Sequence, residues 1–387
     1  MAVEAYSCAR AAPGSSPTST STWNRVSITI DQLCEAANIQ DSPPIALVDT
    51  APVASPHERN RLTLAFHIPQ KFWTSLCEDS SGFFSAYEHH SLHTQERSHR
   101  QAFRFLIKQR VTPNAPLVPT QLAYRWDRLG FVTCWQPHGN LAVLCFDTPA
   151  ALKQDLRDRL AGSEPLTQGH GAFALHPMLL MSVVRSFDTA VWSWRDVVRK
   201  IEETRDARKA VSMHSFADMH ETACHVIHCS DMLTTAQSVM ESISDDIRDY
   251  ATRGLGSPDP EAILREVDFS RSLLTSLLHR SHALEKRLQN EINLAFHLYA
   301  QHNGQVTARI AGLAQRDGEV MKGVSVLGMV FLPGTFVSAV FSMSFFDFAG
   351  PGPAVSGHFW LYWAIAVPLT VLTLVSWHLW QRGHSHI

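Results

Sequence analysis

The sequence predicts an α+β membrane protein: an N-terminal α/β domain on the cytoplasmic side, a long helical hairpin, a stalk helix and two C-terminal transmembrane helices. Three observations predict this class. Two stretches near the C-terminus, residues 323–346 and 359–380, contain no Asp, Glu, Lys or Arg. The hydrophobic period becomes helical after Pro177. No proline occurs between Pro260 and Pro333, so one helical pattern continues into the first apolar stretch.

Composition excludes several classes of protein. The chain has 387 residues with 33 Lys+Arg and 36 Asp+Glu, a net charge of −3, whereas a nucleic-acid-binding protein carries a basic face. The 7 cysteines are scattered and form no CxxC pair, which argues against a disulfide framework. The sequence shows no phosphate loop, nucleophile elbow, zinc-hydrolase motif or kinase signature. We therefore expect a protein that is not an enzyme and binds no nucleic acid.

The N-terminal region has mixed signals. Residues 1–22 are rich in Ser, Thr and Pro and predict a disordered polar tail. Residues 23–170 predict a small α/β domain. Within it, 61–68 alternates like a strand, 131–135 and 141–146 predict a hairpin, and 155–160 predicts a short helix. The few acids near the N-terminus leave a mitochondrial transit peptide open as an alternative.

Helical patterns dominate the rest of the soluble part. Residues 178–252 contain two amphipathic stretches, which predict a helical hairpin. Asp259 is placed to cap a third helix, with Pro260 at its first position. This stalk helix is expected over 259–322. Such a helix cannot bury its apolar stripe alone, so it needs neighbouring helices or copies of itself.

The two apolar stretches predict a membrane hairpin. Residues 323–346 and 359–380 are each long enough to cross a hydrocarbon core of about 30 Å, and 347–358 is a short outer loop. Arg309, Arg316 and Lys322 precede the first span, Arg382 follows the second, and the loop has no Lys or Arg. The positive-inside rule then places both termini, including the tail 381–387, in the cytoplasm or matrix. We expect the plasma membrane rather than the mitochondrial inner membrane.

The first span carries a family resemblance. Met321-Lys322, then Phe331-Leu-Pro333 followed by Thr335, then an aromatic-x-Met-x-Phe ending at Phe345 fall in register without a gap. This pattern resembles CorA-type magnesium transporters. Upstream, 288–296 and 314–317 resemble the stalk of the fungal branch of that superfamily. The motif match covers about residues 284–346, and residues 1–170 match no motif of the family.

The resemblance implies a homopentamer whose long helices line a central pore that passes Mg²⁺ or a related divalent cation. The lipid bilayer and further copies of the chain are the implied partners. No cofactor is implied beyond a divalent cation that is transported or regulatory. The family's outer mouth reads Gly-Met-Asn, and here the corresponding residues are Ser342, Met343 and Ser344. A serine hydroxyl accepts hydrogen bonds from a hydrated cation but is shorter than an amide, so magnesium selectivity does not follow.

Helical spacing identifies candidate pore-lining residues. One stripe of the first span contains Met321, Gly328, Leu332, Thr335, Ala339 and Ser342. If the stripe faces a pore, Met321 and Leu332 form apolar constrictions that gate by dewetting, and Thr335 forms a polar ring between Leu332 and the mouth. The alternative is that the stripe only packs helix on helix, with Thr335 bonded to its own backbone.

Two groups of acids are candidates for concentrating cations at the cytoplasmic end. Asp317 and Glu319 lie close to the first span, and Asp245, Asp246 and Asp249 lie at the end of the second helix. In a pentamer such residues form rings that focus potential; the alternative is a solvated helix face. Cys224-His225-x-x-His228-Cys229 resembles a metal motif, but one helix cannot close a tetrahedral site with these residues.

Two functions remain open from the sequence. The first is a pentameric divalent-cation channel or transporter. The second is a non-conducting protein of the same fold that acts as a membrane scaffold or regulator, for which the altered mouth is the motivation. Loss of Thr335 should change flux under the first hypothesis and do nothing under the second.

Overall fold

The computed structural model of the chain describes residues 2–8, 23–38, 45–48, 55–90, 97–111, 123–136, 141–162, 171–204, 213–254, 259–342 and 359–384. It divides into two compact units, Met1–His297 and Leu298–Ile387. The first unit is the soluble domain, and the second contains the apolar helices.

The soluble domain is built on a mixed sheet that has seven strands in the described part of the chain. The strands are β1 (Ala2–Cys8), β2 (Trp23–Thr29), β3 (Ile45–Val48), β4 (Gly82–His90), β5 (Arg97–Arg110), β6 (Tyr124–Trp135) and β7 (Leu141–Phe146). Their order is β2-β1-β3-β7-β6-β5-β4. β3 pairs with β7 in parallel, and the other neighbours pair antiparallel.

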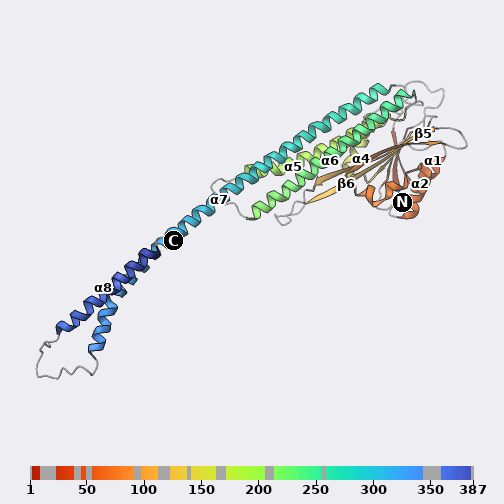
Figure 1. The fold of residues 1–387 in the computed structure, drawn as a ribbon. Helices are drawn as coiled ribbons and strands as arrows, with labels where there is room; N and C mark the ends of the chain where they lie inside the picture. Colours follow the sequence, from red (N-terminus) through yellow and green to blue (C-terminus); the bar gives the residue numbers. More distant parts are fainter. Residues whose placement is uncertain are drawn as a thin grey trace, which may run out of the picture. The chain divides into compact units, whose positions relative to one another are not determined.

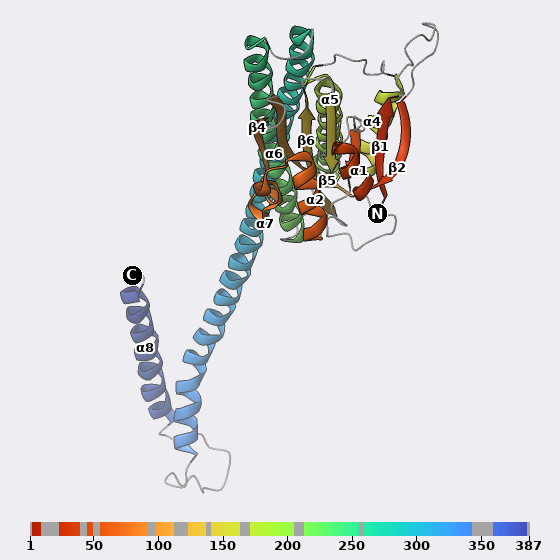
Figure 2. The ribbon, with the colours of Figure 1, turned by 90° about the vertical axis from the view of Figure 1, so that its right-hand side faces the viewer.

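Helices cover both faces of this sheet (Figure 1, Figure 2). One core contains buried residues of α4 (Ala150–Gly162), α5 (His176–Glu203), α6 (Met213–Thr252) and the start of α7 (Pro260–Phe341). The other contains residues of α1 (Ile30–Asn38), α2 (Pro56–Phe66) and η1 (Gln70–Trp73), near α3 (Ser75–Glu78). Side chains alternate between the cores: Phe103 and Phe105 enter the first, and Ala102 enters the second.

Most of the predicted elements are present. The predicted hairpin exists as β6 and β7, with Trp135 opposite Leu141, and the short helix exists as α4. The predicted helical hairpin corresponds to α5 and α6. The Asp259 cap is confirmed, because the backbone N–H of Ala262 donates to its Oδ1 across 2.9 Å.

Two predictions are wrong. Part of the expected disordered tail is ordered, because Ala2–Cys8 forms β1, which pairs with both β2 and β3; residues 9–22 lie outside the described residues. The expected strand at 61–68 belongs to helix α2, which ends at His67 in a left-handed conformation. The spacing of Leu62 and Phe66 fits one face of a helix as well as one face of a strand. Leu64 distinguishes the two structures, because a strand would bury all three side chains on one face and Leu64 is 75% exposed.

α7 packs against α6 with a seven-residue period. Its buried positions include Val267, Leu274, Ser281, Leu288 and Ala295, a spacing typical of helices that pack in a left-handed coil. Arg287 of α7 also forms an ion pair with Glu202 of α5. These contacts fix the first part of α7 to the soluble domain.

Gly82 at the start of β4 permits the close approach of α6. Its φ of +155° is unfavourable for other residues, and a Cβ there would lie 2.9 Å from the carbonyl oxygen of Arg104 and 3.1 Å from Thr235. A side chain at this position would push β4 away from both neighbours.

Two helices, α7 and α8 (Phe359–His384), are long and apolar enough to cross a membrane. Only 11% of the apolar segment of α7 and 6% of that of α8 is buried within the chain. The core helix of a soluble protein is mostly buried, so this exposure favours a lipid environment. The predicted first span continued to residue 346; α7 ends at Phe341, and 343–350 lie outside the described residues.

Candidate functional site

α8 packs against one face of α7. Val337 of α7 and Ala366 of α8 are buried, at 4% and 5% exposure. The hydroxyl of Tyr362 on α8 lies 3.4 Å from the carbonyl oxygen of Gly334 and 3.5 Å from Oγ of Ser338. Pro333 is buried on the same side of α7. One face of the predicted first span is therefore occupied by α8.

The predicted stripe lies on the opposite face of α7. At about 100° per residue, its six residues fall within an arc of about 80° that points away from Pro333 and Val337. Met321 and Leu332 are 68% and 69% exposed, and Thr335, Ala339 and Ser342 are also exposed. Within one chain, no described element covers this stripe.

The hydroxyls of the stripe are bonded to their own helix. Oγ1 of Thr335 lies 2.9 Å from the carbonyl oxygens of both Phe331 and Leu332. Oγ of Ser342 donates to the carbonyl oxygen of Ala339 across 2.9 Å. A hydroxyl that donates its proton to the backbone keeps its lone pairs as acceptors. These residues thus present acceptor oxygens rather than donors. Of the three mouth residues, Met343 and Ser344 lie outside the described residues.

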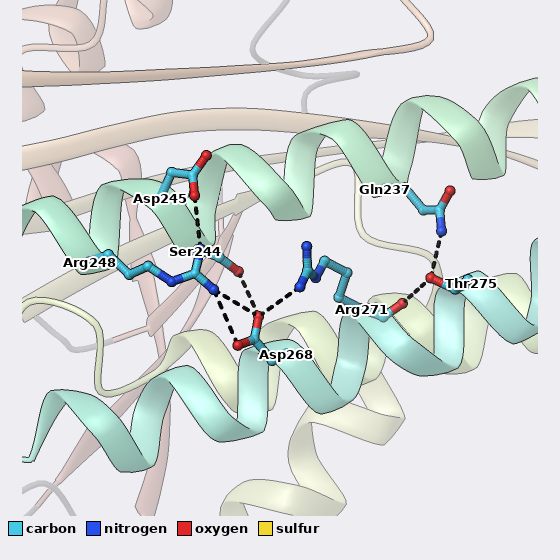
Figure 3. Close-up of polar contacts among 7 residues, drawn as sticks. All are labelled: Gln237, Ser244, Asp245, Arg248, Asp268, Arg271 and Thr275. Atoms are coloured by element: carbon cyan, nitrogen blue, oxygen red, sulfur yellow. Dashed lines mark hydrogen bonds and ion pairs between the residues drawn. The ribbon is translucent and has the colours of Figure 1, made fainter.

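The three acids at the end of α6 do not form one cluster. Asp245 accepts from Arg248 across 2.9 Å (Figure 3), and Asp249 pairs with Arg253, which also contacts Glu88. Arg248 additionally reaches Asp268 of α7. Asp245 is held by Arg248 of its own helix and Asp249 by Arg253, which directly follows that helix. Exposed pairs of this kind contribute little to stability.

Asp246 points into the domain instead. Its Oδ2 lies 2.8 Å from Nε2 of His99 and accepts from Nε2 of Gln101 across 2.5 Å. Oε1 of Gln101 in turn lies 2.5 Å from Nε2 of His176. Because Gln101 uses its amide N–H on Asp246, its oxygen accepts and Nε2 of His176 carries a proton. Burial, with His99 nearby, lowers the pKa of His176 to about 4.

The acidic residues nearest the first span are solvent-exposed and, unlike Asp246, are not part of a buried network. Asp317 and Glu319 are both exposed on α7. In the described part of the chain, no group of three or more His, Cys, Asp or Glu side chains is arranged to hold a metal ion. A single chain therefore offers isolated carboxylates near the first span rather than a built metal centre.

The Cys224–Cys229 segment also does not gather into a metal site. His225 stacks on Trp194 with ring centroids 4.7 Å apart. His228 lies 3.0 Å from the amine of Lys108 through Nδ1. Cys229 is buried and Cys224 exposed, so the two cysteines face different environments. Sequence reasoning missed Lys108, whose signal is a charge directly after the three apolar residues Phe105–Ile107.

Comparisons with known proteins agree with this architecture. No protein-family model matches the chain. The complete CorA magnesium transporter from Methanocaldococcus jannaschii is similar in structure, with a TM-score of 0.51 at 10% identity, over 97% of this chain and 96% of that one. The ZntB cytoplasmic domain from Vibrio parahaemolyticus gives a TM-score of 0.44 at 11% identity, over 79% of this chain and 98% of that one.

The N-terminal α/β domain, long stalk helix and two apolar C-terminal helices define a protein with the CorA-like transporter fold. A curated relative is Notoamide biosynthesis cluster protein M' from Aspergillus versicolor, which is 33% identical over 225 residues. This match covers 52% of the chain and 47% of the relative. The chain thus spans about half the length of the curated relative it matches.

Proposed function

We propose that the chain forms a homopentameric channel or transporter for divalent metal cations, with the stripe of α7 facing a central pore. The observation that carries the proposal is the position of the stripe. α8 occupies the face of α7 that contains Val337, and the stripe with Met321, Leu332 and Thr335 lies on the opposite, uncovered face. Small residues on α7, such as Gly328, let symmetry-related helices approach closely.

The chemistry of the stripe suits a hydrated cation. A divalent ion such as Mg²⁺ gives up its water reluctantly, and its bound waters direct their protons outward. Thr335 and Ser342 direct acceptor lone pairs away from their own helix, and acceptors are what such waters need. Met321 and Leu332 would close the path by dewetting when the helices approach.

Carboxylates on the cytoplasmic side would raise the local cation concentration. Asp317 and Glu319 are exposed on α7. At about 100° per residue Asp317 falls within the arc of the stripe, so five copies of it would form a ring that focuses a negative potential, whereas Glu319 falls on the opposite side of the helix. We assign this role to Asp317 rather than to the acids at the end of α6, because Asp246 is bonded inside the domain and the other two are paired with arginines. Both termini are proposed to be cytoplasmic and the membrane to be the plasma membrane.

A second candidate function rests on the altered mouth. Ser342 and Ser344 replace the residues around the family's Met, and the loop 347–358 has Asp347 as its one acid. A wider mouth that holds a hydrated ion weakly is what a non-conducting scaffold or regulatory protein of this fold would have.

Ion flux separates the two functions. The full-length protein is reconstituted into liposomes, and influx of Mg²⁺, Ni²⁺, Co²⁺ and Zn²⁺ is measured with fluorescent indicators. Channel function predicts flux that Thr335→Leu blocks and whose ion ranking Ser344→Asn changes. Leu327→Ala, about 60° outside the arc of the stripe and 58% exposed, is the control and should conduct normally. An assembled pentamer that passes none of the four ions would overturn the channel proposal in favour of the scaffold.

A further inference from the structure

A buried lysine in the soluble domain forms no ion pair within the described part of the chain, although the carboxylate of Glu221 lies near enough to act on it. Lys108, on β5 opposite Trp126, is 3% exposed. Its amine lies 4.2 Å from the ring centroid of Tyr124 and 4.8 Å from that of Trp126. Its one polar side-chain partner among the described residues is Nδ1 of His228, at 3.0 Å.

The partners of Lys108 are all neutral groups. A nitrogen that accepts from an ammonium is unprotonated, and Lys108 together with burial lowers the pKa of His228. No carboxylate in the described part of the chain forms an ion pair with this amine. Removing a charge from water costs several kcal/mol unless an opposite charge accompanies it, and cation–π contacts return only part of this. Burial accordingly lowers the pKa of Lys108.

A second buried group beside Lys108 also lacks a partner. His225 is 5% exposed and lies between the rings of Trp194 and Tyr124, with centroid distances of 4.7 and 4.8 Å. Neither of its ring nitrogens has a hydrogen-bond partner. The carboxylate of Glu221 is 3.8 Å from Nε2, which is beyond hydrogen-bonding distance. Burial, followed by the charge of Lys108, lowers the pKa of His225 to about 4. The ring is therefore neutral and has one N–H to donate.

We propose that Lys108 and His225 hold a small monovalent inorganic anion, of the size of chloride, between the ammonium and the imidazole N–H. The anion supplies the negative charge that Lys108 lacks and the acceptor that His225 lacks. The rings of Tyr124 and Trp126, which lie against the Lys108 amine, are 45% and 36% exposed, so the site lies close to the surface. This site is independent of the proposed ion pathway.

Thermal unfolding of the full-length protein in detergent tests the proposal. The apparent Tm is measured in sodium chloride and in sodium gluconate at equal ionic strength. An anion that binds only the folded state raises the Tm by about 2–4 °C, and the rise grows with the logarithm of its concentration above Kd. Lys108→Met keeps the length of the side chain and should abolish the difference between chloride and gluconate. Lys200→Met, exposed on α5, is the matched control and should retain it.

Two further variants keep the test decisive if Lys108→Met does not fold. His225→Phe preserves the stack on Trp194 but removes the N–H, and should also abolish the chloride effect. Glu221→Gln removes the nearest competing carboxylate and should enlarge it. An equal effect of chloride on all variants would be a general salt effect and would overturn the proposal. So would equal Tm values of the natural chain in chloride and gluconate.

Discussion

Asp246 of α6 and His99 of β5 lie 2.8 Å apart, carboxylate to Nε2, beneath the helical layer of the soluble domain. Gln101 adds a second hydrogen bond to the same carboxylate oxygen and connects it to His176 at the start of α5. The four side chains thus join α5, α6 and the sheet through one polar network. Nδ1 of His99 and Nδ1 of His176 have no hydrogen-bond partner in the described part of the chain, so each ring is held through Nε2, and loss of an Nε2 partner would leave the ring without any hydrogen bond.

Removal of Asp246 should be costly. Asp246→Ala leaves the N–H groups of His99 and Gln101 buried without an acceptor, and we expect a loss of about 2–4 kcal/mol in the free energy of unfolding. Asp245→Ala is the matched control, because its partner Arg248 is exposed to water, and it should cost less than about 0.5 kcal/mol. Urea unfolding followed by tryptophan fluorescence measures both. Equal losses would mean that the network adds no stability.

The soluble domain should lose stability as the pH falls. Burial lowers the pKa of His176 and His225 from 6.5 to about 4. The folded state therefore binds fewer protons than the unfolded state between these values. The stability from the two neutral rings is complete above about pH 6.5 and is lost progressively as the pH falls to about 4.

The dependence of this stability on pH can be measured. Each of these histidines contributes up to about one proton taken up on unfolding near pH 5. The apparent Tm of the full chain should fall between pH 7.5 and 5, and His225→Phe should make the fall shallower. His279→Phe, an exposed histidine on α7, should leave the slope unchanged. If His225→Phe leaves the fall of Tm with pH unchanged, His225 does not contribute to the loss of stability at low pH.

The sequence predicts the helical parts of the fold well because their physical signals are strong and local. Asp259 and Pro260 mark the start of α7, and the seven-residue spacing of Val267 and Leu274 marks its buried face. The strand predicted around Leu64 failed because Leu62 and Phe66 fit both periods. The strand Ala2–Cys8 was missed because it is held by pairing with Ile45–Val48 and with Trp23–Thr29, contacts that no local pattern reveals.

In the candidate site, too, features with a local sequence signal were predicted and features that depend on tertiary contacts were not. The stripe of α7 follows from helical spacing alone, and its role as a pore lining stays a prediction. Helical spacing does not predict which of the acidic side chains on α6 is buried. Asp245 and Asp246 are neighbours in sequence, but one faces water and Arg248, and the other faces His99. Which neighbour is buried depends on how α6 lies on β5, a tertiary contact that charge patterning does not report.

Large substitutions on α8 should destabilise the membrane hairpin on the face that contacts α7 and should be tolerated on the exposed face. Ala366 is 5% exposed against α7, whereas its neighbour Val367 is 49% exposed. Ala366→Phe inserts a large ring into a closed contact and should lower the apparent Tm in detergent by several degrees, because overpacking costs about 1–3 kcal/mol. Val367→Phe should change it little. The reverse order would show that α8 uses another face.

The apolar constriction at Leu332 should set the basal leak. Leu332 and Leu327 are both exposed on α7, 69% and 58%, but at about 100° per residue they point about 140° apart. A serine at 332 wets the constriction, so Leu332→Ser should raise divalent-cation flux in liposomes about tenfold or more, because the dewetting barrier is lowered. Leu327→Ser places the same hydroxyl off the stripe and should leave the flux unchanged. A larger leak through Leu327→Ser than through Leu332→Ser would mean that α7 is rotated, with the Leu327 face toward the pore.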